Sequence, residues 1–226
     1  MKRSLKILLA SLALATCAFG FTACGTDTEN DNSGTNNGGN EQQPGDNNND
    51  NNPTGTKEWT FEAEYTYVDD LVGAGSSNSA KGKNMILKAT KASNGHYIGF
   101  THKKDLTITF EITAAKATTA RLKVGLTPAE GMNAISISPE TFIVKVNDAA
   151  ISYKQQNVVD NASNMNSRTF KKYDIGDVQL KEGLNIITLT IGDNDFVNGK
   201  AGGPSIDAIY LSTNDDLSWI PEEDNI

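Results

Sequence analysis

The sequence has almost no cysteine and no recognisable catalytic apparatus. Its two cysteines, Cys17 and Cys24, lie near the start of the 226-residue chain, so nothing after them can form a disulfide or a thiolate metal site. A Gly-x-Ser-x-Gly elbow, a histidine pair at metal-binding spacing and a phosphate-binding loop are also missing. We therefore expect a protein that is not an enzyme and has no catalytic residues. The 28 acidic residues nevertheless leave room for the carboxylate pair that glycoside hydrolysis needs.

The chain also lacks an apolar run long enough to span a bilayer. Residues 1–6 are basic and residues 7–21 are apolar or small, the layout of a secretory signal peptide of residues 1–23. The tetrapeptide Phe21-Thr22-Ala23-Cys24 resembles a lipobox, which implies cleavage before Cys24 and lipidation of its sulfur. We expect membrane attachment by this lipid anchor only. Cleavage before Cys17 is disfavoured by the preceding Thr16, and a plain secreted protein is the alternative.

Basic residues are scarce relative to acidic ones. The chain has 20 Lys and Arg against 28 Asp and Glu, and loss of Lys2, Arg3 and Lys6 with the signal would take the formal charge from −8 to −11. A nucleic-acid partner would require a basic surface instead. We expect no binding to nucleic acid.

Large apolar residues are missing from residues 25–56, which consist mainly of Asn, Asp, Gly, Thr, Gln and Pro. Such a segment cannot offset the entropy of folding, so residues 24–56 are predicted to form a disordered stalk behind the lipid. The acidic residues Asp27, Glu29 and Asp31 resemble the surface-export signals of Bacteroidetes lipoproteins. This predicts an outer-membrane lipoprotein at the cell surface, with a periplasm-facing lipoprotein as the alternative.

Residues 57–213 are predicted to form one domain, in which several runs alternate in hydrophobicity. Apolar residues recur at every second position in residues 106–112, 122–126, 142–146 and 187–191, which is typical of half-buried strands. Asn147-Asp148 and residues 181–183 are predicted turns, and residues 206–211 a closing strand. No stretch has a helical period. We therefore predict an all-β fold, an antiparallel β-sandwich, followed by an acidic tail of residues 214–226 that contains Trp219 and either docks or stays loose.

Five short motifs occur in a characteristic order along this domain. They are Phe61-Glu62-Ala63-Glu64, Gly95-His96-Tyr97-Ile98-Gly99-Phe100, Val146-Asn147-Asp148, Leu180-Lys181-Glu182-Gly183-Leu184-Asn185-Ile186-Ile187 and Ile206-Asp207-Ala208-Ile209. In order and spacing they resemble the carbohydrate-binding modules of families six and thirty-five. The resemblance implies a galactose-binding-like jelly roll that binds glycans without cleaving them.

Glu62 and Glu64 are candidate metal ligands. Two residues apart on a strand, they would share one face while Phe61, Ala63 and Tyr65 take the other. Calcium accepts six to eight oxygen ligands and suits a site without Cys or His. The resemblance implies that Glu62, Glu64 and Asp207 bind a structural Ca²⁺ that ties the first strand to the last. Two solvated surface glutamates are the alternative.

The sugar site is expected where aromatic and polar side chains meet in loops. In the family that the chain resembles, the site usually contains an aromatic pair, a Tyr and an Asn. Here Phe170 and Tyr173 occupy the positions of the pair, Leu126 falls near the position of the Tyr, and Ser205 replaces the Asn. A second candidate surface is the loop of residues 192–203, with Asp193, Asn194 and Phe196. The predicted carbohydrate-binding residues are thus Phe170, Tyr173, Asp193, Asn194, Phe196 and Ser205. Phe170 could equally be core, and the loop merely a mobile surface loop.

These features together predict a surface-tethered lipoprotein that binds polysaccharide or oligosaccharide through a calcium-stabilised sandwich. Many tethered copies on one cell would raise a modest affinity. Leu126 and Ser205 differ from the residues that the family usually has in its sugar cleft, so a second interpretation stays open. In it, the same sandwich is a structural or adhesive cell-envelope protein that binds a protein partner.

Overall fold

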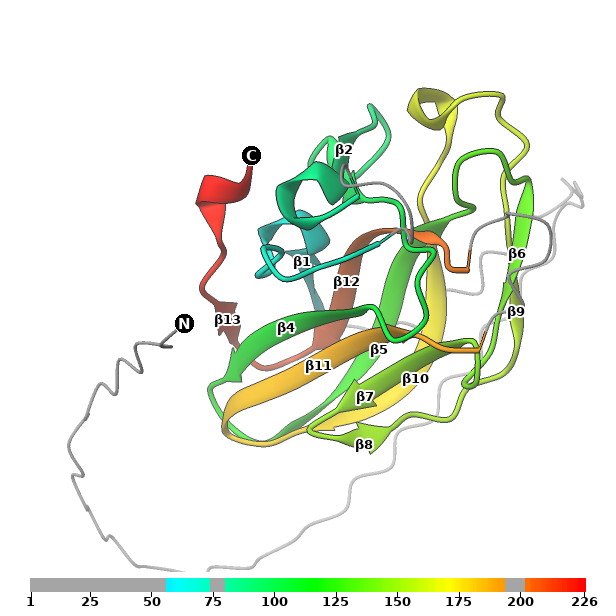
Figure 1. Ribbon diagram of the computed structural model, residues 1–226. Helices are drawn as coiled ribbons and strands as arrows, with labels where there is room; N and C mark the ends of the chain where they lie inside the picture. Colours follow the sequence, from blue (N-terminus) through cyan, green and yellow to red (C-terminus); the bar gives the residue numbers. More distant parts are fainter. Residues whose placement is uncertain (1–55, 74–79, 194–201) are drawn as a thin grey trace, which may run out of the picture. The chain divides into compact units, whose positions relative to one another are not determined.

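The computed structural model describes residues 56–73, 80–193 and 202–226, which form two antiparallel sheets packed face to face (Figure 1). One sheet has the order β10-β5-β12-β3-β2, with β1 also paired to β12; the other has the order β13-β4-β11-β7-β8. Strands β6 and β9 form a separate two-stranded sheet. The expected antiparallel β-sandwich is confirmed.

The strands are β1 (Lys57–Glu62), β2 (Ile86–Lys88), β3 (His96–Ile98), β4 (Thr107–Ala114), β5 (Thr118–Thr127), β6 (Ala134–Ile137), β7 (Phe142–Val146), β8 (Ala149–Ala150), β9 (Gln156–Val159), β10 (Lys171–Leu180), β11 (Gly183–Ile191), β12 (Ser205–Thr213) and β13 (Leu217–Trp219). The helical elements among the described residues are 3-10 turns: η1 (Ala63–Tyr65), η2 (Gly82–Met85), η3 (Met165–Ser167) and η4 (Glu223–Asn225). No helix in the described part of the chain is long and apolar enough to cross a membrane.

The core lies between the two sheets, where the alternating apolar residues of the sequence meet. Ile108, Phe110 and Ile112 of β4 are buried against Leu122 and Val124 of β5, while the residues between them face outward. Alternation with period two places each strand's apolar face inward without help from helices. The predicted strands in these segments are confirmed.

Two predicted turns are also confirmed. Asn147 and Asp148 join β7 to β8 with φ of 49° and 69°, and Gly183 begins β11 with φ of 82°. Asn185 fixes the second turn, because its side-chain oxygen accepts from the Lys181 N–H and its amide donates to the carbonyls of Lys181 and Gly183. Short polar side chains that bond to nearby backbone favour such turns.

The C-terminal end takes the docked alternative for the tail and adds a strand that was not predicted. The expected closing strand is β12, but β13 follows it within the expected tail and pairs with β4, Leu217 opposite Ala114 and Trp219 opposite Ile112. Trp219 packs against the core. The tail therefore docks and extends the second sheet.

Three connections gather on one side of the sandwich, drawn uppermost in Figure 1. They are residues 89–95, 128–133 and 160–170, and we call them the loop platform. Strand β12 begins on this side, with Ser205 opposite Thr127, and ends on the other side, where Thr213 pairs with Lys57. Thr56, the first described residue, therefore enters the sandwich far from the loop platform.

Candidate carboxylate site and loop platform

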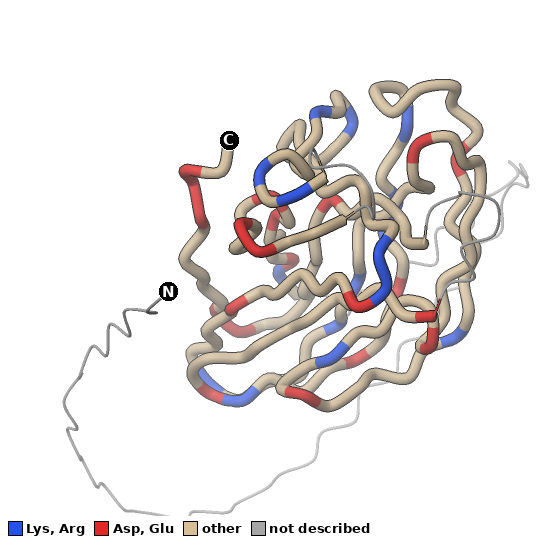
Figure 2. The backbone as a smooth tube through the Cα atoms, viewed as in Figure 1, with Lys and Arg blue, Asp and Glu red and all other residues tan. Residues whose placement is uncertain are grey.

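Glu62 and Glu64 lie close to Asp207 in the fold although Asp207 is far from both of them in the sequence. Glu62 ends β1 and pairs with Ala208, the neighbour of Asp207, while Glu64 lies in η1 directly after β1. Figure 2 shows acidic segments at this corner of the fold. The pairing of β1 with β12 brings the predicted ligand residues together, as the resemblance implied.

The two glutamates are not placed as predicted. Strand β1 stops at Glu62 and the chain turns into η1, so Ala63 and Glu64 are both buried instead of facing opposite sides. Glu62 and Tyr65 are half-buried. The prediction that Glu64 continues the strand on the same face as Glu62 is wrong. A single 3-10 turn replaces the strand at this position and places the Glu64 side chain in the interior.

Ser93 joins Glu62 to Asp207 from the loop between β2 and β3. Its hydroxyl donates to Glu62 Oε2 at 2.5 Å and its backbone N–H donates to Asp207 Oδ1 at 3.0 Å. The hydroxyl of Tyr210 donates to the other Asp207 oxygen at 3.2 Å. Space for Asp207 depends on Gly125 of β5, because a Cβ there would lie 3.2 Å from Asp207 Oδ2.

Glu64 is the most isolated of the three carboxylates. Its side chain is completely buried, and Asn94 Nδ2 approaches Oε1 at 3.4 Å while donating at 2.8 Å to the Tyr65 hydroxyl. The other oxygen, Oε2, is buried with no hydrogen-bond partner among the described residues. A buried carboxylate oxygen without a partner is costly, so this position calls for a proton or a cation.

Burial disfavours the charged forms of all three acids, and repulsion from neighbouring carboxylates adds to this effect at Glu62 and Glu64. Burial raises the pKa of Glu64 to about 8, with further upward contributions from Glu62 and Asp207. Burial also raises the pKa of Glu62, opposed by the Ser93 bond and reinforced by Asp207, and raises the pKa of Asp207 against the Ser93 and Tyr210 bonds. A buried cluster of like charges behaves in this way until a positive partner neutralises it.

The donor set fits a hard cation in chemistry. Three carboxylates, one with a buried unpartnered oxygen, are the ligand type that Ca²⁺ prefers, whereas a softer metal would prefer Cys or His ligands. As the side chains stand, no group of three His, Cys, Asp or Glu within the described ranges is arranged to hold a metal ion. Glu62 and Asp207 instead share Ser93, so the side chains would have to turn toward a common ion. The calcium site stays a prediction.

Two of the predicted sugar-binding residues, Phe170 and Ser205, are covered. Phe170 is 8% exposed and packs on Tyr97 with 5.1 Å between ring centroids, in a small cluster beneath residues 89–92. Ser205 is 2% exposed. As they stand, Phe170 and Ser205 present little surface to a ligand, and Phe170 is covered by a cluster that contains Ala89, Ala92 and Tyr97.

Tyr173 and Asp193 are engaged elsewhere. Tyr173 is half-buried against the main core, and its hydroxyl accepts from the Val159 N–H of β9 at 3.3 Å. Asp193 is exposed and pairs with Lys104. Asn194 and Phe196 lie outside the described residues, as do the signal peptide, Cys24 and all of the predicted stalk except Thr56. The role of these residues stays a prediction.

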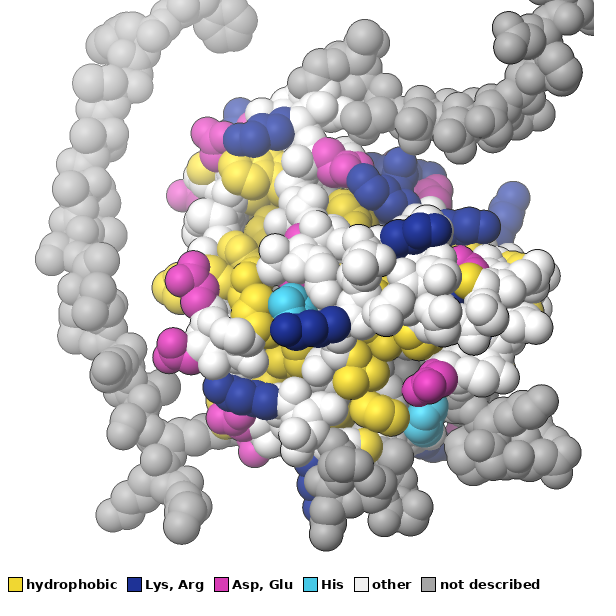
Figure 3. All heavy atoms as spheres, turned by 90° about the horizontal axis from the view of Figure 1, so that it is seen from above, with side chains coloured by type: hydrophobic (Ala, Val, Ile, Leu, Met, Phe, Trp, Pro, Cys, Tyr) yellow, Lys and Arg dark blue, Asp and Glu magenta, His cyan; other side chains and the backbone are white. Residues whose placement is uncertain are grey.

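Hydrogen bonds tie the three loops of the platform to one another. Thr90 Oγ1 donates to the Asn166 carbonyl at 2.8 Å, and the Asp160 N–H donates to the Asn133 carbonyl at 3.0 Å. Arg168, 3% exposed, donates to the carbonyls of Pro128 and Ala129 at 2.6 and 2.9 Å. Viewed from this side, much of the surface is backbone or side chains that are neither charged nor hydrophobic, with apolar patches and side chains of both charges between them (Figure 3).

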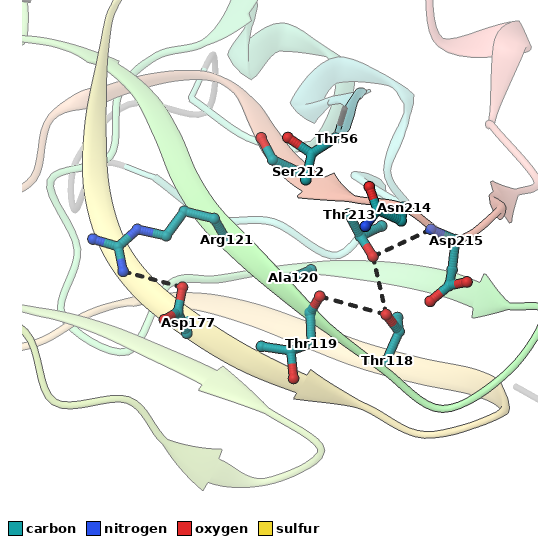
Figure 4. Close-up of a pocket in the computed structure, with 10 residues that line it drawn as sticks. All are labelled: Thr56, Thr118, Thr119, Ala120, Arg121, Asp177, Ser212, Thr213, Asn214 and Asp215. Carbon is teal, nitrogen blue, oxygen red and sulfur yellow. Dashed lines mark hydrogen bonds and ion pairs between the residues drawn. The ribbon is translucent and has the colours of Figure 1, made fainter. Parts of the chain in front are cut away.

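A polar groove of about 480 Å³ lies at the opposite end of the first sheet (Figure 4). Its lining includes Arg121, which donates to Asp177 at 3.1 Å, and Thr118, whose hydroxyl lies 3.0 Å from that of Thr213. The described residues that line it are Thr56, Thr118, Thr119, Ala120, Arg121, Asp177, Ser212, Thr213, Asn214 and Asp215. None of these described lining residues has an aromatic side chain on which a sugar ring could stack.

Comparison with known proteins gives matches among solved structures. No protein-family model matches the chain, and no curated protein does. The chain is similar to a family 35 carbohydrate-binding module from an environmental isolate, with 21% identity over 72% of this chain and 97% of that one and a TM-score of 0.49. It is also similar to a family 35 module from Clostridium thermocellum (13% identity, 69% and 97% covered, TM-score 0.47). A third is a family 35 module in complex with a glucuronic acid containing disaccharide (12% identity, 71% and 96% covered, TM-score 0.46).

Proposed function

We propose that this chain is a non-catalytic glycan-binding module whose sandwich is stabilised by calcium. The observation that carries the proposal is the pairing of β1 with β12, which brings Glu62, Glu64 and Asp207, the ligand set implied by the sequence motifs, into one region where Glu64 Oε2 is buried without a partner among the described residues. In this proposal Ca²⁺ neutralises the three carboxylates and joins β1 to β12. Its role is stability, because the carboxylates are covered by Ser93 and Asn94 rather than open to a substrate.

The loop platform is the proposed glycan-binding surface. Its loops are held to each other before any ligand binds, which lowers the entropy lost on binding. Exposed amides such as Asn133 and Asn161 are suited to sugar hydroxyls. Phe170 would then support the platform from below through Tyr97, instead of stacking on the sugar itself.

We further propose that the module is a lipoprotein held through Cys24 at the outer face of the outer membrane. The support is in the sequence alone: the signal peptide, the lipobox-like tetrapeptide and the polar stalk. A flexible stalk lets many copies reach one polysaccharide, so that weak individual contacts add to a strong total attachment.

The test is a glycan array probed with the full chain, once with calcium and once with a chelator, and including a glucuronic acid containing disaccharide. Asn133→Ala and Asn161→Ala change the platform, while Asn214→Ala makes the same chemical change at the opposite end of the sheet. We expect a glycan signal that either platform variant weakens and Asn214→Ala retains. A signal that is lost only in Asn214→Ala would move the site to the polar groove.

One observation favours a structural or adhesive function instead. The exposed large hydrophobic residues in the described part of the chain are Tyr67, Val159, Leu184, Ile220 and Ile226, and none of them lies in the loop platform. Sugar sites commonly offer an aromatic face. If the folded protein in calcium gives no binding signal with plant, host or microbial glycans, a cell-envelope protein partner would therefore be favoured.

A further inference from the structure

The C-terminal segment, residues 217–226, reaches the carboxylate site from the far end of the chain. After Trp219 the chain leaves the second sheet, with Ile220 92% exposed, and then returns to η1, the turn that carries Glu64. The Glu222 N–H donates to the Tyr65 carbonyl at 2.8 Å. Lys83 Nζ adds a bond at 2.6 Å to the Asp224 carbonyl.

Asn225 makes the most specific of these contacts. Its side-chain amide donates at 2.8 Å to the Glu64 carbonyl and at 2.8 Å to the Thr66 carbonyl. A primary amide has two N–H groups, so both are used and two backbone acceptors on either side of Tyr65 are satisfied together. The Asn225 side chain thereby holds the backbone of η1 at two points.

The turn itself has few internal bonds to hold its shape. Within it, the N–H and hydroxyl of Thr66 donate to the Ala63 carbonyl at 3.2 and 2.7 Å. A 3-10 turn of three residues is intrinsically weak. When the three acids are ionised, repulsion between Glu64 and the neighbouring Glu62 and Asp207 acts to move the turn away from the cluster. The contacts from Glu222 and Asn225 oppose that displacement.

We propose that Asn225 is a positioning residue for Glu64, and that residues 217–226 form a clasp whose docking is coupled to cation binding at Glu62, Glu64 and Asp207. The inference rests on the proposed calcium site. Asn225 acts through the backbone of Glu64 and does not itself touch the ion. Coupling between two binding events is reciprocal. If docking of the clasp raises the calcium affinity by some factor, calcium must raise the equilibrium constant for docking by the same factor.

The test is a calcium titration of the full chain by isothermal titration calorimetry. Asn225→Ala removes both amide donors, and deletion of residues 222–226 removes the whole return to η1 while leaving β13 in place. Asn214→Ala is the matched control, since it makes the same change in an exposed residue just before β13. We expect Asn225→Ala and the deletion to weaken calcium binding by about tenfold, as loss of an outer-shell partner commonly does, and Asn214→Ala to leave it unchanged.

A second readout needs no variant. In the unaltered chain, saturating calcium should slow hydrogen exchange of the Glu222 amide, which donates to Tyr65. Unchanged exchange, or wild-type affinity in both Asn225→Ala and the deletion, would overturn the clasp while leaving the calcium site intact. A wild-type chain that gives no calcium heat and no exchange response would instead overturn the calcium site and the clasp with it.

Discussion

Trp219 meets Phe61 edge-on, with 5.5 Å between ring centroids and 89° between ring planes. Trp219 also stacks on Phe110 at 6.5 Å, so one indole joins β1 of the first sheet to β4 of the second. We expect Trp219→Ala to lower the free energy of unfolding by about 3 kcal/mol, measured by urea denaturation. Trp219→Phe, which keeps an aromatic ring, should lose less than half of that. Equal stability of the alanine variant and the wild type would mean that the docked tail contributes nothing to the sandwich.

Glu64→Gln should have opposite effects with and without calcium. In a chelator, the raised pKa of Glu64 means that its contribution to stability is fully present below the unfolded value of 4.5 and is lost as the pH rises through about 8. Glutamine removes that loss, so the variant should melt higher than the wild type at pH 8. With calcium the order should reverse, because the variant lacks one anionic ligand.

The measurement is a pair of melting curves for each protein at pH 8, one in calcium and one in chelator. Thr107→Ala, on the outer side of β4, is a control that should respond to calcium as the wild type does. The same order of melting temperatures in both solutions would argue against cation binding at Glu64.

His102 should make the protein sensitive to mild acid. Burial lowers its pKa from 6.5, and its Nδ1 is buried with no hydrogen-bond partner among the described residues. The folded state therefore binds the proton less well than the unfolded state, so stability is present above pH 6.5 and is lost as the pH falls through the folded value. Equilibrium unfolding between pH 7.5 and about pH 5 should show a smaller decline for His102→Gln than for the wild type. His96→Gln is the control, and a decline that follows His96 instead would contradict the prediction.

Gly125→Ala should disturb the carboxylate site from beneath. The added Cβ would lie 3.1 Å from the Tyr210 ring and 3.2 Å from Asp207 Oδ2, closer than most real contacts. We expect a loss of about 1–3 kcal/mol in unfolding free energy, the usual cost of overpacking. Calcium affinity should fall as well, because Asp207 is displaced from Ser93. A variant that keeps wild-type calcium affinity would show that Asp207 is not a ligand.

The fold was largely predictable because strand alternation and turn residues act locally. The apolar residues Ile108, Phe110 and Ile112 and the turn at Asn147-Asp148 each carry their signal within a few positions. Strand β13 was missed because three residues, Leu217 to Trp219, are too short to show a period. Its pairing with β4 depends on a partner about 100 residues earlier in the sequence.

The candidate site was only partly predictable. Glu62, Glu64 and Asp207 were found through motifs, but Ser93 and Asn225 are common residues in unremarkable sequence, and their contacts arise only from the folded loops. Phe170 gave an ambiguous signal, since an aromatic residue before a strand is equally consistent with recognition and packing. Its burial was decided by residues 89–97, which fold over it from another part of the chain.

The direction of β1 has a mechanical consequence. The chain enters β1 at the end of the sheet away from the loop platform, and β1 pairs with β12 continuously from Lys57 to Glu62. A force applied through the tether before Thr56, with a polymer bound at the loop platform, would pull β1 along its own axis relative to β12. The hydrogen bonds between the two strands would then resist the force together instead of breaking one after another. An ion bridging Glu62 to Asp207 would lock the far end of the same ladder. The proposed calcium would then resist the separation of β1 from β12 under force. Force spectroscopy should therefore record a lower unfolding force in chelator than in calcium.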